Sequence, residues 1–181
     1  MAEKGLIYKG LKPVYWSPSS ESALAEAEIE YHDKEDTSIY FSLPILDEGE
    51  FKGAKFIVWT TTPWTLPANL AVCAGPEIDY VLAQTDKGLF VFGEELLAKL
   101  TELLELGTVN VLAHYKGKDL EYIEYEQLIP FAKVEGKAFE VVADNYVTAE
   151  DGTGIVHIAP AFGEDDNKVC RENGIAFVNP V

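Results

Sequence analysis

The chain has 181 residues, a length that fits one sizeable domain, and 48% of them are hydrophobic, which excludes global disorder. A net charge of −17, from 31 acidic and 14 basic residues, argues against tight, independent, non-specific binding to nucleic acid, because such binding depends on cationic side chains. No apolar run approaches the roughly 20 residues that span a bilayer, and the N-terminus lacks the pattern of a signal peptide. We therefore expect a cytoplasmic protein without a membrane partner; if it handles RNA, another domain must hold most of that RNA.

The N-terminal part is expected to consist of short extended segments. Lys12–Trp16 is predicted as a strand and Ser17–Ser20 as a turn. Ala23–Glu28 has helical propensity, whereas the alternation of polar and apolar residues over Glu28–Leu43 predicts a hairpin.

The next segment combines two buried strands with a stiff loop. Lys55–Thr61 is rich in β-branched and aromatic residues and Leu70–Ala74 is a short apolar run, so both are predicted as strands. Between them, Pro63 and Pro67 are expected to exclude regular structure from Thr62–Asn69.

A hairpin and the clearest helix are predicted to follow. Tyr80–Gln84 and Leu89–Phe92 flank the turn Thr85–Gly88 and are predicted to pair. Glu94–Leu106 carries leucines at helical spacing, and Gly107 is expected to end this helix.

The C-terminal part adds three strands and a second helix. Val109–Tyr115, Phe139–Asp144 and Ile155–Ala159 are predicted as strands, and Glu164–Asn173 as a helix that ends before Gly174. Many short strands with few helices predict a mainly β fold, with a β-barrel core, hairpin extensions and a few α-helices.

The cysteines and histidines give no sign of a metal site. Cys73 and Cys170 form neither a CxxC pair nor a disulfide framework, so we expect buried, reduced thiols. The chain has three histidines, and none clusters in sequence with the cysteines. We therefore expect no metal and no cofactor.

Four threonines lie within six positions at the end of the predicted strand Lys55–Thr61. Their β-branched side chains also suit strand ends, which is the purely structural interpretation. The prolines, however, fix the backbone in the way that a pocket wall requires. Threonine hydroxyls can bond an ester carbonyl, a ribose hydroxyl or a water, while the stiff methyl groups can limit the size of a bound side chain. Asn69 offers a donor and an acceptor or serves turn chemistry, and Trp64 is predicted to pack rather than to stack on a base.

A second unusual segment, Gly152–Asp166, carries a histidine on a strand and three acids at the start of a helix. The turn at Pro160 and Gly163 is short, so His157 and the first helical turn are expected at one rim. Acids at a helix N-terminus are also explained by the helix dipole, and a lone strand histidine is often a core residue. In the functional interpretation, one carboxylate binds a substrate ammonium. No nucleophile motif such as G-x-S-x-G is present, so we expect no covalent catalysis.

Together these segments resemble the editing domain of class I isoleucyl-tRNA synthetases over nearly the whole chain. The motifs that carry the resemblance are Gly5–Gly10, Lys12–Trp16, Ser20–Tyr31, Thr60–Asn69 and Gly152–Asp166. The resemblance implies the fold of the valyl, isoleucyl and leucyl editing domains. It also implies a single domain over residues 1–181, excised from a larger synthetase, with 1–20 and 175–181 near the junctions with the parent catalytic domain.

Two differences from the valyl and leucyl relatives favour the isoleucyl branch. Those relatives carry T-T-R-P where this chain has Thr60–Pro63, and often W-C-P-x-x-C where this chain has Trp16–Ser20 without cysteine. The synthetic signatures H-I-G-H and K-M-S-K-S are absent, so no synthetic active site is expected in this fragment.

The function that the resemblance implies is editing. An aminoacyl-tRNA deacylase of this kind hydrolyses the ester of misacylated valyl-tRNA(Ile) and excludes isoleucine; valyl-adenylate is a second substrate to consider. The implied partners are the 3′ acceptor end of tRNA(Ile) carrying valine and the remainder of the parent synthetase. We expect the isolated domain to be a monomer.

The resemblance also assigns roles to individual residues. Asp166 is expected to anchor the α-ammonium of the misattached amino acid, and His157 to line the side-chain pocket and help reject isoleucine. Asn69 is expected to support the loop or the hydrolytic step as a substrate-binding residue. The attacking water is oriented either by a free ribose hydroxyl of the substrate or by His157 acting as the base.

The threonine motif is expected to supply the remaining contacts. Thr60, Thr61 and Thr62 are assigned to the aminoacyl group, the terminal ribose or the attacking water. Trp64 and Thr65 are further expected substrate contacts.

Two other functions remain open at the level of the sequence. The chain could be a non-catalytic module that positions the tRNA acceptor end for the parent enzyme. Alternatively, it could be an unrelated metal-free hydrolase that uses His157 and Asp166 together.

Overall fold

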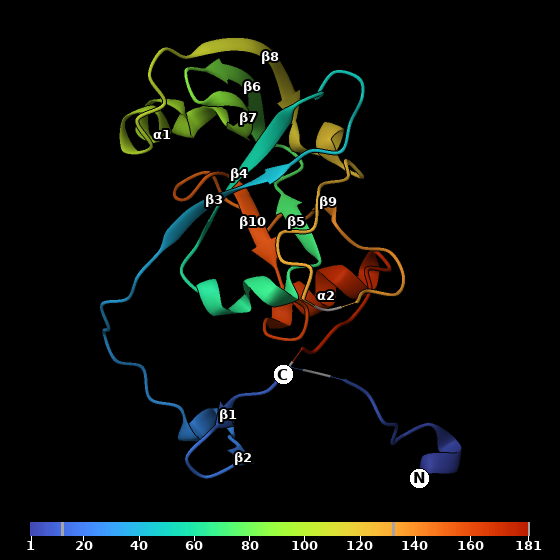
Figure 1. Cartoon of the computed structure of the whole chain (residues 1–181). Coiled ribbons are helices and arrows are strands. Elements are labelled where there is room, and N and C mark those ends of the chain that lie inside the picture. Colours follow the sequence, from blue (N-terminus) through green and yellow to red (C-terminus); the bar gives the residue numbers. More distant parts are fainter. Residues whose placement is uncertain (12, 132, 181) are drawn as a thin grey trace.

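A curled, mixed β-sheet forms the body of the protein (Figure 1). The computed structural model describes residues 1–11, 13–131 and 133–180. The strands are β1 (Trp16–Ser17), β2 (Ser22–Ala23), β3 (Ile39–Pro44), β4 (Ala54–Thr60), β5 (Ala71–Ala74), β6 (Asp79–Thr85), β7 (Gly88–Gly93), β8 (Asn110–Lys116), β9 (Glu140–Ala143) and β10 (Ile155–Ile158). The helices are α1 (Leu97–Leu103), α2 (Glu164–Glu172) and the 3₁₀ helices η1 (Ala2–Lys4), η2 (Glu26–Glu28), η3 (Pro63–Ala68), η4 (Glu94–Leu96) and η5 (Gly117–Leu120).

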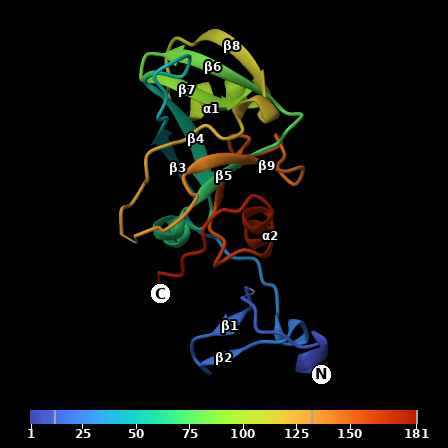
Figure 2. The ribbon, with the colours of Figure 1, turned by 90° about the vertical axis from the view of Figure 1, so that its right-hand side faces the viewer.

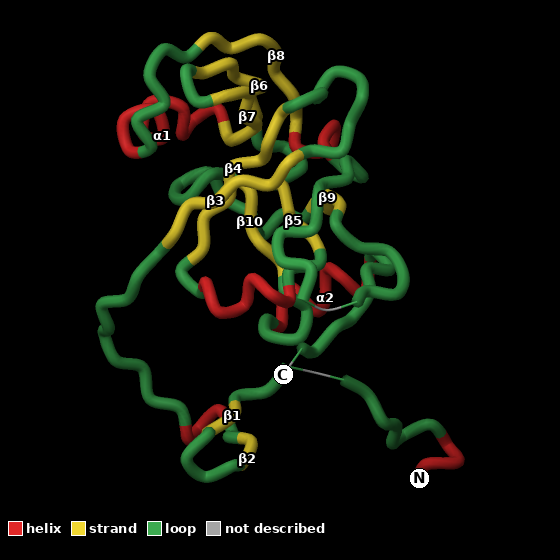
Figure 3. The backbone as a smooth tube through the Cα atoms, viewed as in Figure 1, coloured by secondary structure: helices red, strands yellow, loops and turns green. Residues whose placement is uncertain are grey.

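The strand order explains the curled shape of the sheet. The eight strands of the main sheet run in the order β8-β6-β7-β4-β10-β5-β9, and β3 pairs with β4 off this path. Because β8 and β9 end this order, the sheet is an open half-barrel, whose curl Figure 2 shows from the side. Helices take up a small share of the chain (Figure 3). The prediction of a mainly β fold with few helices is confirmed.

The core lies on both faces of the sheet because neighbouring side chains of a strand point in opposite directions. Phe56 and Val58 of β4 belong to one buried cluster, whereas Ile57 between them belongs to another, which includes Leu100 of α1. The clusters on both faces therefore fix β4 as a central strand. Burying a side chain of this size fully stabilises a fold by about 1.5–3 kcal/mol.

Parallel pairing of β4 with β10 positions the functional site. Trp59 of β4 and Val156 of β10 are register partners in this pair. The carboxyl ends of parallel strands meet at the same edge of a sheet. The segments that follow β4 and β10, namely η3 and the turn into α2, therefore lie side by side at that edge (Figure 1).

Two predictions for the N-terminal part are wrong. Of the strand predicted over Lys12–Trp16, residue 12 lies outside the described residues and only Trp16 is in a strand, where it pairs with Ala23 in a two-stranded ribbon. Figures 1 and 2 both show this ribbon apart from the main sheet, so the preceding residues have no neighbouring strand to pair with. The hairpin predicted over Glu28–Leu43 does not form, because Ile39–Pro44 pairs with β4 instead.

The proline-rich loop is more regular than predicted. Pro63–Ala68 forms the 3₁₀ helix η3, so the expectation that Pro63 and Pro67 exclude regular structure is wrong. Pro63 opens this helix, where a missing backbone N–H costs nothing. Short 3₁₀ segments tolerate such sequences because few hydrogen bonds are needed to form them.

The first helix is shorter than predicted. Glu94–Leu106 divides into η4 and α1, and the α-helix ends at Leu103. Glu105 adopts the left-handed conformation, with φ of 50°, and the Leu106 N–H bonds back to the Thr101 carbonyl at 3.0 Å. Glu105 therefore ends the helix before Gly107 is reached.

Of the helical propensity expected over Ala23–Glu28, only the short 3₁₀ helix η2 is realised, and Ala23 lies in β2. The remaining predicted elements are confirmed. The hairpin of β6 and β7, the strands β5, β8, β9 and β10, and helix α2 all lie where the sequence places them. Cys73 and Cys170 are buried free thiols, and burial raises the pKa of each to about 12. None of the helices in the described residues is long and apolar enough to cross a membrane.

Candidate functional site

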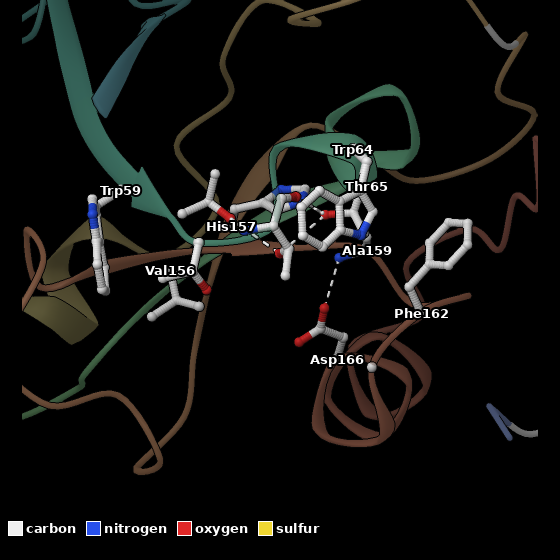
Figure 4. Close-up of a pocket in the computed structure, with 12 residues that line it drawn as sticks. Trp59, Trp64, Thr65, Val156, His157, Ala159, Phe162 and Asp166 are labelled. Atoms are coloured by element: carbon white, nitrogen blue, oxygen red, sulfur yellow. Dashed lines mark hydrogen bonds between the residues drawn. The ribbon is translucent and has the colours of Figure 1, made fainter. Parts of the chain in front are cut away.

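A cavity of about 480 Å³ opens at the sheet edge where β4 and β10 end. Its lining comes from the end of β4, from η3, from β10 and from the start of α2, as Figure 4 shows. The lining residues are Trp59, Thr60, Thr61, Thr62, Trp64, Thr65, Val156, His157, Ala159, Phe162, Gly163 and Asp166. All but one of the site residues expected from the sequence are therefore brought together; Asn69 is buried behind the wall instead.

The threonines form a braced wall rather than an exposed cluster. The Thr60 hydroxyl accepts a hydrogen bond from the Thr62 N–H at 3.1 Å, and the Thr65 hydroxyl donates to the Thr62 carbonyl at 2.8 Å. Thr60 and Thr65 are buried, whereas Thr61 and Thr62 are exposed. The buried pair thus fixes the backbone, and the exposed pair presents hydroxyl and methyl groups to the cavity.

His157 is held from both ring nitrogens. Its Nδ1 lies 2.8 Å from the Asn69 side-chain nitrogen, and its Nε2 lies 3.0 Å from the Thr65 hydroxyl. An amide nitrogen can only donate, so Nδ1 accepts and the ring proton of neutral His157 is on Nε2. Burial lowers the pKa of His157 to about 4, so the ring is neutral near pH 7.

This burial predicts a specific dependence of stability on pH. The unfolded chain protonates His157 near pH 6.5, whereas the folded chain does so only near pH 4, so the unfolded state binds more protons between these values. Stability is then fully present above pH 6.5 and is lost as the pH falls. We expect the free energy of unfolding, relative to that of His157→Gln, to fall by about 3 kcal/mol across this window.

Urea denaturation at several pH values measures this difference. His114→Gln is the matched control, since the His114 side chain is 61% exposed. Equal pH dependence in the wild-type chain and His157→Gln would contradict the structure.

Asp166 presents a partly satisfied carboxylate to the cavity. Its Oδ2 accepts a hydrogen bond from the Ala159 N–H at 2.8 Å (Figure 4). Among the described residues no cation pairs with it. Burial raises the pKa of Asp166, the Ala159 hydrogen bond opposes this shift, and the nearby Asp165 charge adds to it. A nearby positive charge favours the ionised form of such a carboxylate, so this position could accept a ligand cation such as an ammonium group.

The sequence did not single out several residues of this site. A Cβ atom on Gly163 would lie 2.8 Å from the Asp166 Cγ, so glycine is needed for the close approach of this carboxylate. Trp59, Val156, Ala159 and Phe162 complete the lining. Val156, Ala159 and Phe162 lie within the motif around His157, and Trp59 directly precedes the threonine motif, but apolar lining residues and core residues look alike in sequence.

Trp64 does not pack in the core. Its side chain is 63% exposed, so the prediction that it packs is wrong. Phe162, which is 43% exposed, also lines the cavity, so two accessible aromatic rings border the space beside Asp166 (Figure 4).

Comparison with known proteins agrees with the architecture. Residues 1–156 match the family model of tRNA synthetases class I (I, L, M and V). Isoleucine–tRNA ligases from Malacoplasma penetrans and Acholeplasma laidlawii are 46% and 47% identical to the chain over its whole length. The chain spans about 20% of the length of each of these relatives.

Solved structures show the same fold at low sequence identity. The crystal structure of GlLeuRS-CP1 matches with a TM-score of 0.58 at 14% identity, over 76% of this chain and 65% of that one. The cytosolic leucyl-tRNA synthetase editing domain of P. knowlesi matches with a TM-score of 0.57 at 12% identity, over 81% and 67%. The resemblance expected from the motifs is confirmed: the chain belongs to the class I tRNA synthetase family of the isoleucine, leucine, methionine and valine group and has the fold of its editing domains.

Proposed function

We propose that this chain is an aminoacyl-tRNA deacylase that hydrolyses valyl-tRNA(Ile), and valyl-adenylate as a second substrate, while sparing isoleucyl-tRNA. One observation carries the proposal. The half-buried carboxylate of Asp166, which pairs with no cation of residues 1–11, 13–131 and 133–180, lines the same cavity as His157 and the hydrogen-bonded threonines. This arrangement provides an anchor for a charged amine at a fixed position relative to a steric limit.

The cavity wall formed by His157 and the threonines must distinguish valine from isoleucine, which differ by one methylene. One methylene in a hydrophobic pocket is worth about 1–3 kcal/mol, a limit for which isoleucyl-tRNA synthetases are themselves the general illustration. A second, tighter pocket reverses the discrimination, since overpacking by the extra methylene of isoleucine costs about 1–3 kcal/mol when the wall is rigid. The bonds that hold His157 and Thr65 supply this rigidity.

The proposed hydrolytic step depends on where Asp166 holds the substrate. With the substrate ammonium on Asp166, the ester carbonyl lies beside the threonine motif, where the exposed hydroxyls of Thr61 and Thr62 stabilise the developing oxyanion. Both nitrogens of His157 are already bonded and its pKa is lowered, so His157 is a weak candidate for the base. We assign the orientation of the attacking water to the free hydroxyl of the terminal ribose.

The partners follow from charge and from length. A net charge of −17 disfavours independent binding of tRNA, so we propose that the remainder of a larger synthetase presents the 3′ acceptor end of tRNA(Ile) to this domain. In this proposal residues 1–181 form one monomeric domain, with 1–20 and 175–181 near its junctions with the rest of the enzyme. Its location in the cytoplasm remains a prediction.

Deacylation by the purified chain tests the proposed function. We expect valyl-tRNA(Ile) to be hydrolysed at least tenfold faster than isoleucyl-tRNA(Ile), with spontaneous hydrolysis of each ester as the baseline. Binding without hydrolysis would instead support a module that only positions the acceptor end. Equal hydrolysis of both esters would contradict the proposed exclusion of isoleucine.

A further inference from the structure

A chain of buried hydrogen bonds runs from the core to the cavity wall. The Tyr125 hydroxyl donates to the Asn69 side-chain oxygen at 2.7 Å, and the Asn69 nitrogen donates to His157 Nδ1 at 2.8 Å. His157 Nε2 then donates to the Thr65 hydroxyl at 3.0 Å, which donates to the Thr62 carbonyl at 2.8 Å. Each group can act in only one direction along this path, so the chain has a single consistent set of donors and acceptors.

Tyr125 is the innermost member of this chain. It is 1% exposed, belongs to the same core cluster as Phe56 and stacks edge-on against Phe139 at 6.2 Å between ring centroids. It does not line the cavity. Its backbone is also fixed, since its N–H bonds to the Phe139 carbonyl at 2.8 Å. The phenol is therefore a rigid support with its hydroxyl directed at Asn69.

The Asn69 amide depends on this hydroxyl. Its nitrogen donates to the Ala71 carbonyl at 2.9 Å as well as to His157, so both amide protons are in use. Within the described residues, Tyr125 is the one donor to the amide oxygen. Without the hydroxyl, a buried acceptor would lack a partner, and the amide would shift to satisfy it.

We propose that Tyr125 is a positioning residue for selectivity: its hydroxyl holds the Asn69 amide and, through it, the His157 ring at the place where the ring excludes isoleucine. This inference rests on the proposed function, because exclusion of isoleucine is the property that the fixed ring serves. Tyr125 acts without touching the substrate.

Tyr125→Phe removes the hydroxyl and keeps the packed ring. Tyr80→Phe is the matched control, because Tyr80 lies in the same core cluster and its buried hydroxyl bonds to the Gly75 N–H and the Gly154 carbonyl, away from the cavity. Both variants are expected to lower the melting temperature. Only Tyr125→Phe is expected to lower the ratio of kcat/KM for valyl-tRNA over isoleucyl-tRNA, roughly tenfold, on the order of one net hydrogen bond.

Coupling through Asn69 is tested by a double-mutant cycle. If Tyr125 acts through the amide, Tyr125→Phe changes selectivity in the wild-type background but not in the Asn69→Ala background. An equal effect in both backgrounds would overturn the proposal, as would an equal loss of selectivity in Tyr80→Phe.

A second readout does not depend on activity. The chain has three histidines, and only His157 among them is buried, so NMR on histidine labelled with ¹⁵N resolves its Nε2–H proton. We expect this proton to exchange with water at least tenfold faster in Tyr125→Phe than in the wild type or in Tyr80→Phe. Unchanged exchange would overturn the positioning role even if deacylation is observed. Faster exchange in a chain without deacylase activity would support the role of Tyr125 and reject the proposed function.

Discussion

Asp166→Asn is expected to lower kcat/KM for valyl-tRNA deacylation at least roughly a hundredfold, which is on the order of one charge-assisted hydrogen bond to the substrate ammonium. Asparagine retains an oxygen that can accept the bond from the Ala159 N–H, so the turn before α2 keeps its geometry. The variant therefore isolates the negative charge from the shape of the side chain. Single-turnover deacylation with excess enzyme measures the effect.

The loss of activity should come with no loss of stability. The pKa of Asp166 is raised in the folded state by burial, so its contribution to stability is present below the unfolded pKa and is lost as the pH rises through the folded pKa. Above the folded pKa the ionised group destabilises the fold, and asparagine relieves this cost. We expect a melting temperature equal to or above that of the wild type.

Asp165→Asn is the matched control for this prediction. Asp165 is the exposed neighbour in the same helical turn and does not line the cavity. It should retain deacylation within about threefold. Full activity in Asp166→Asn, or an equal loss in both variants, would remove the ammonium-anchor role.

His157→Ala is expected to raise the deacylation of correctly charged isoleucyl-tRNA roughly ten- to hundredfold. The imidazole lines the cavity, and its removal opens space for the extra methylene, whose exclusion costs about 1–3 kcal/mol. Valyl-tRNA should remain a substrate because the anchor at Asp166 is untouched. The rates on both esters, measured side by side, give the selectivity directly.

Two further substitutions set a scale for the expected gain in isoleucyl-tRNA deacylation. Thr62→Ala removes a smaller part of the same wall and should give a smaller gain on isoleucyl-tRNA. His114→Ala, at an exposed position, should give none. If His157→Ala leaves isoleucyl-tRNA uncut and valyl-tRNA cleaved as before, the wall does not determine selectivity.

From its residues, the sequence predicted that His157 and the acids of the following helix lie at one rim, and only the family resemblance placed the threonine motif in the same pocket. The threonine motif leaves β4, and the acids of α2 follow β10 after a short turn. What the sequence could not give is that β4 and β10 run parallel and adjacent, since the register Trp59 to Val156 depends on packing between distant segments. Each motif indicated one half of the site, and the parallel pairing of β4 with β10 brings the two halves together.

The contacts of Asn69 and Tyr125 could not be predicted from local sequence patterns. Asn69 was expected to support the loop or the hydrolytic step as a substrate-binding residue; it is 4% exposed and bonds to His157 from behind the cavity wall. Tyr125 sits in an irregular segment and carries no motif, although its hydroxyl reaches a residue 56 positions away. Hydrogen bonds of this range are set by the folded core and leave no periodic signal in the sequence.

The N-terminal predictions failed for a related reason. The alternation over Glu28–Leu43 does predict extended backbone, but a strand needs a partner, and only Ile39–Pro44 finds one in β4. Conversely, the strand Lys55–Thr61 was predicted almost to its ends because both of its faces are buried, which demands a continuous apolar run.

The roles of Asp166 and His157 can be seen in a structure of the chain with a non-hydrolysable valyl-ester analogue of the terminal adenosine. We expect the valyl ammonium to lie within hydrogen-bond distance of an Asp166 oxygen and the valine methyl groups to contact the His157 ring. An amine bound away from residue 166, or a cavity that accepts the isoleucyl analogue in the same pose without displacement of His157, would contradict it.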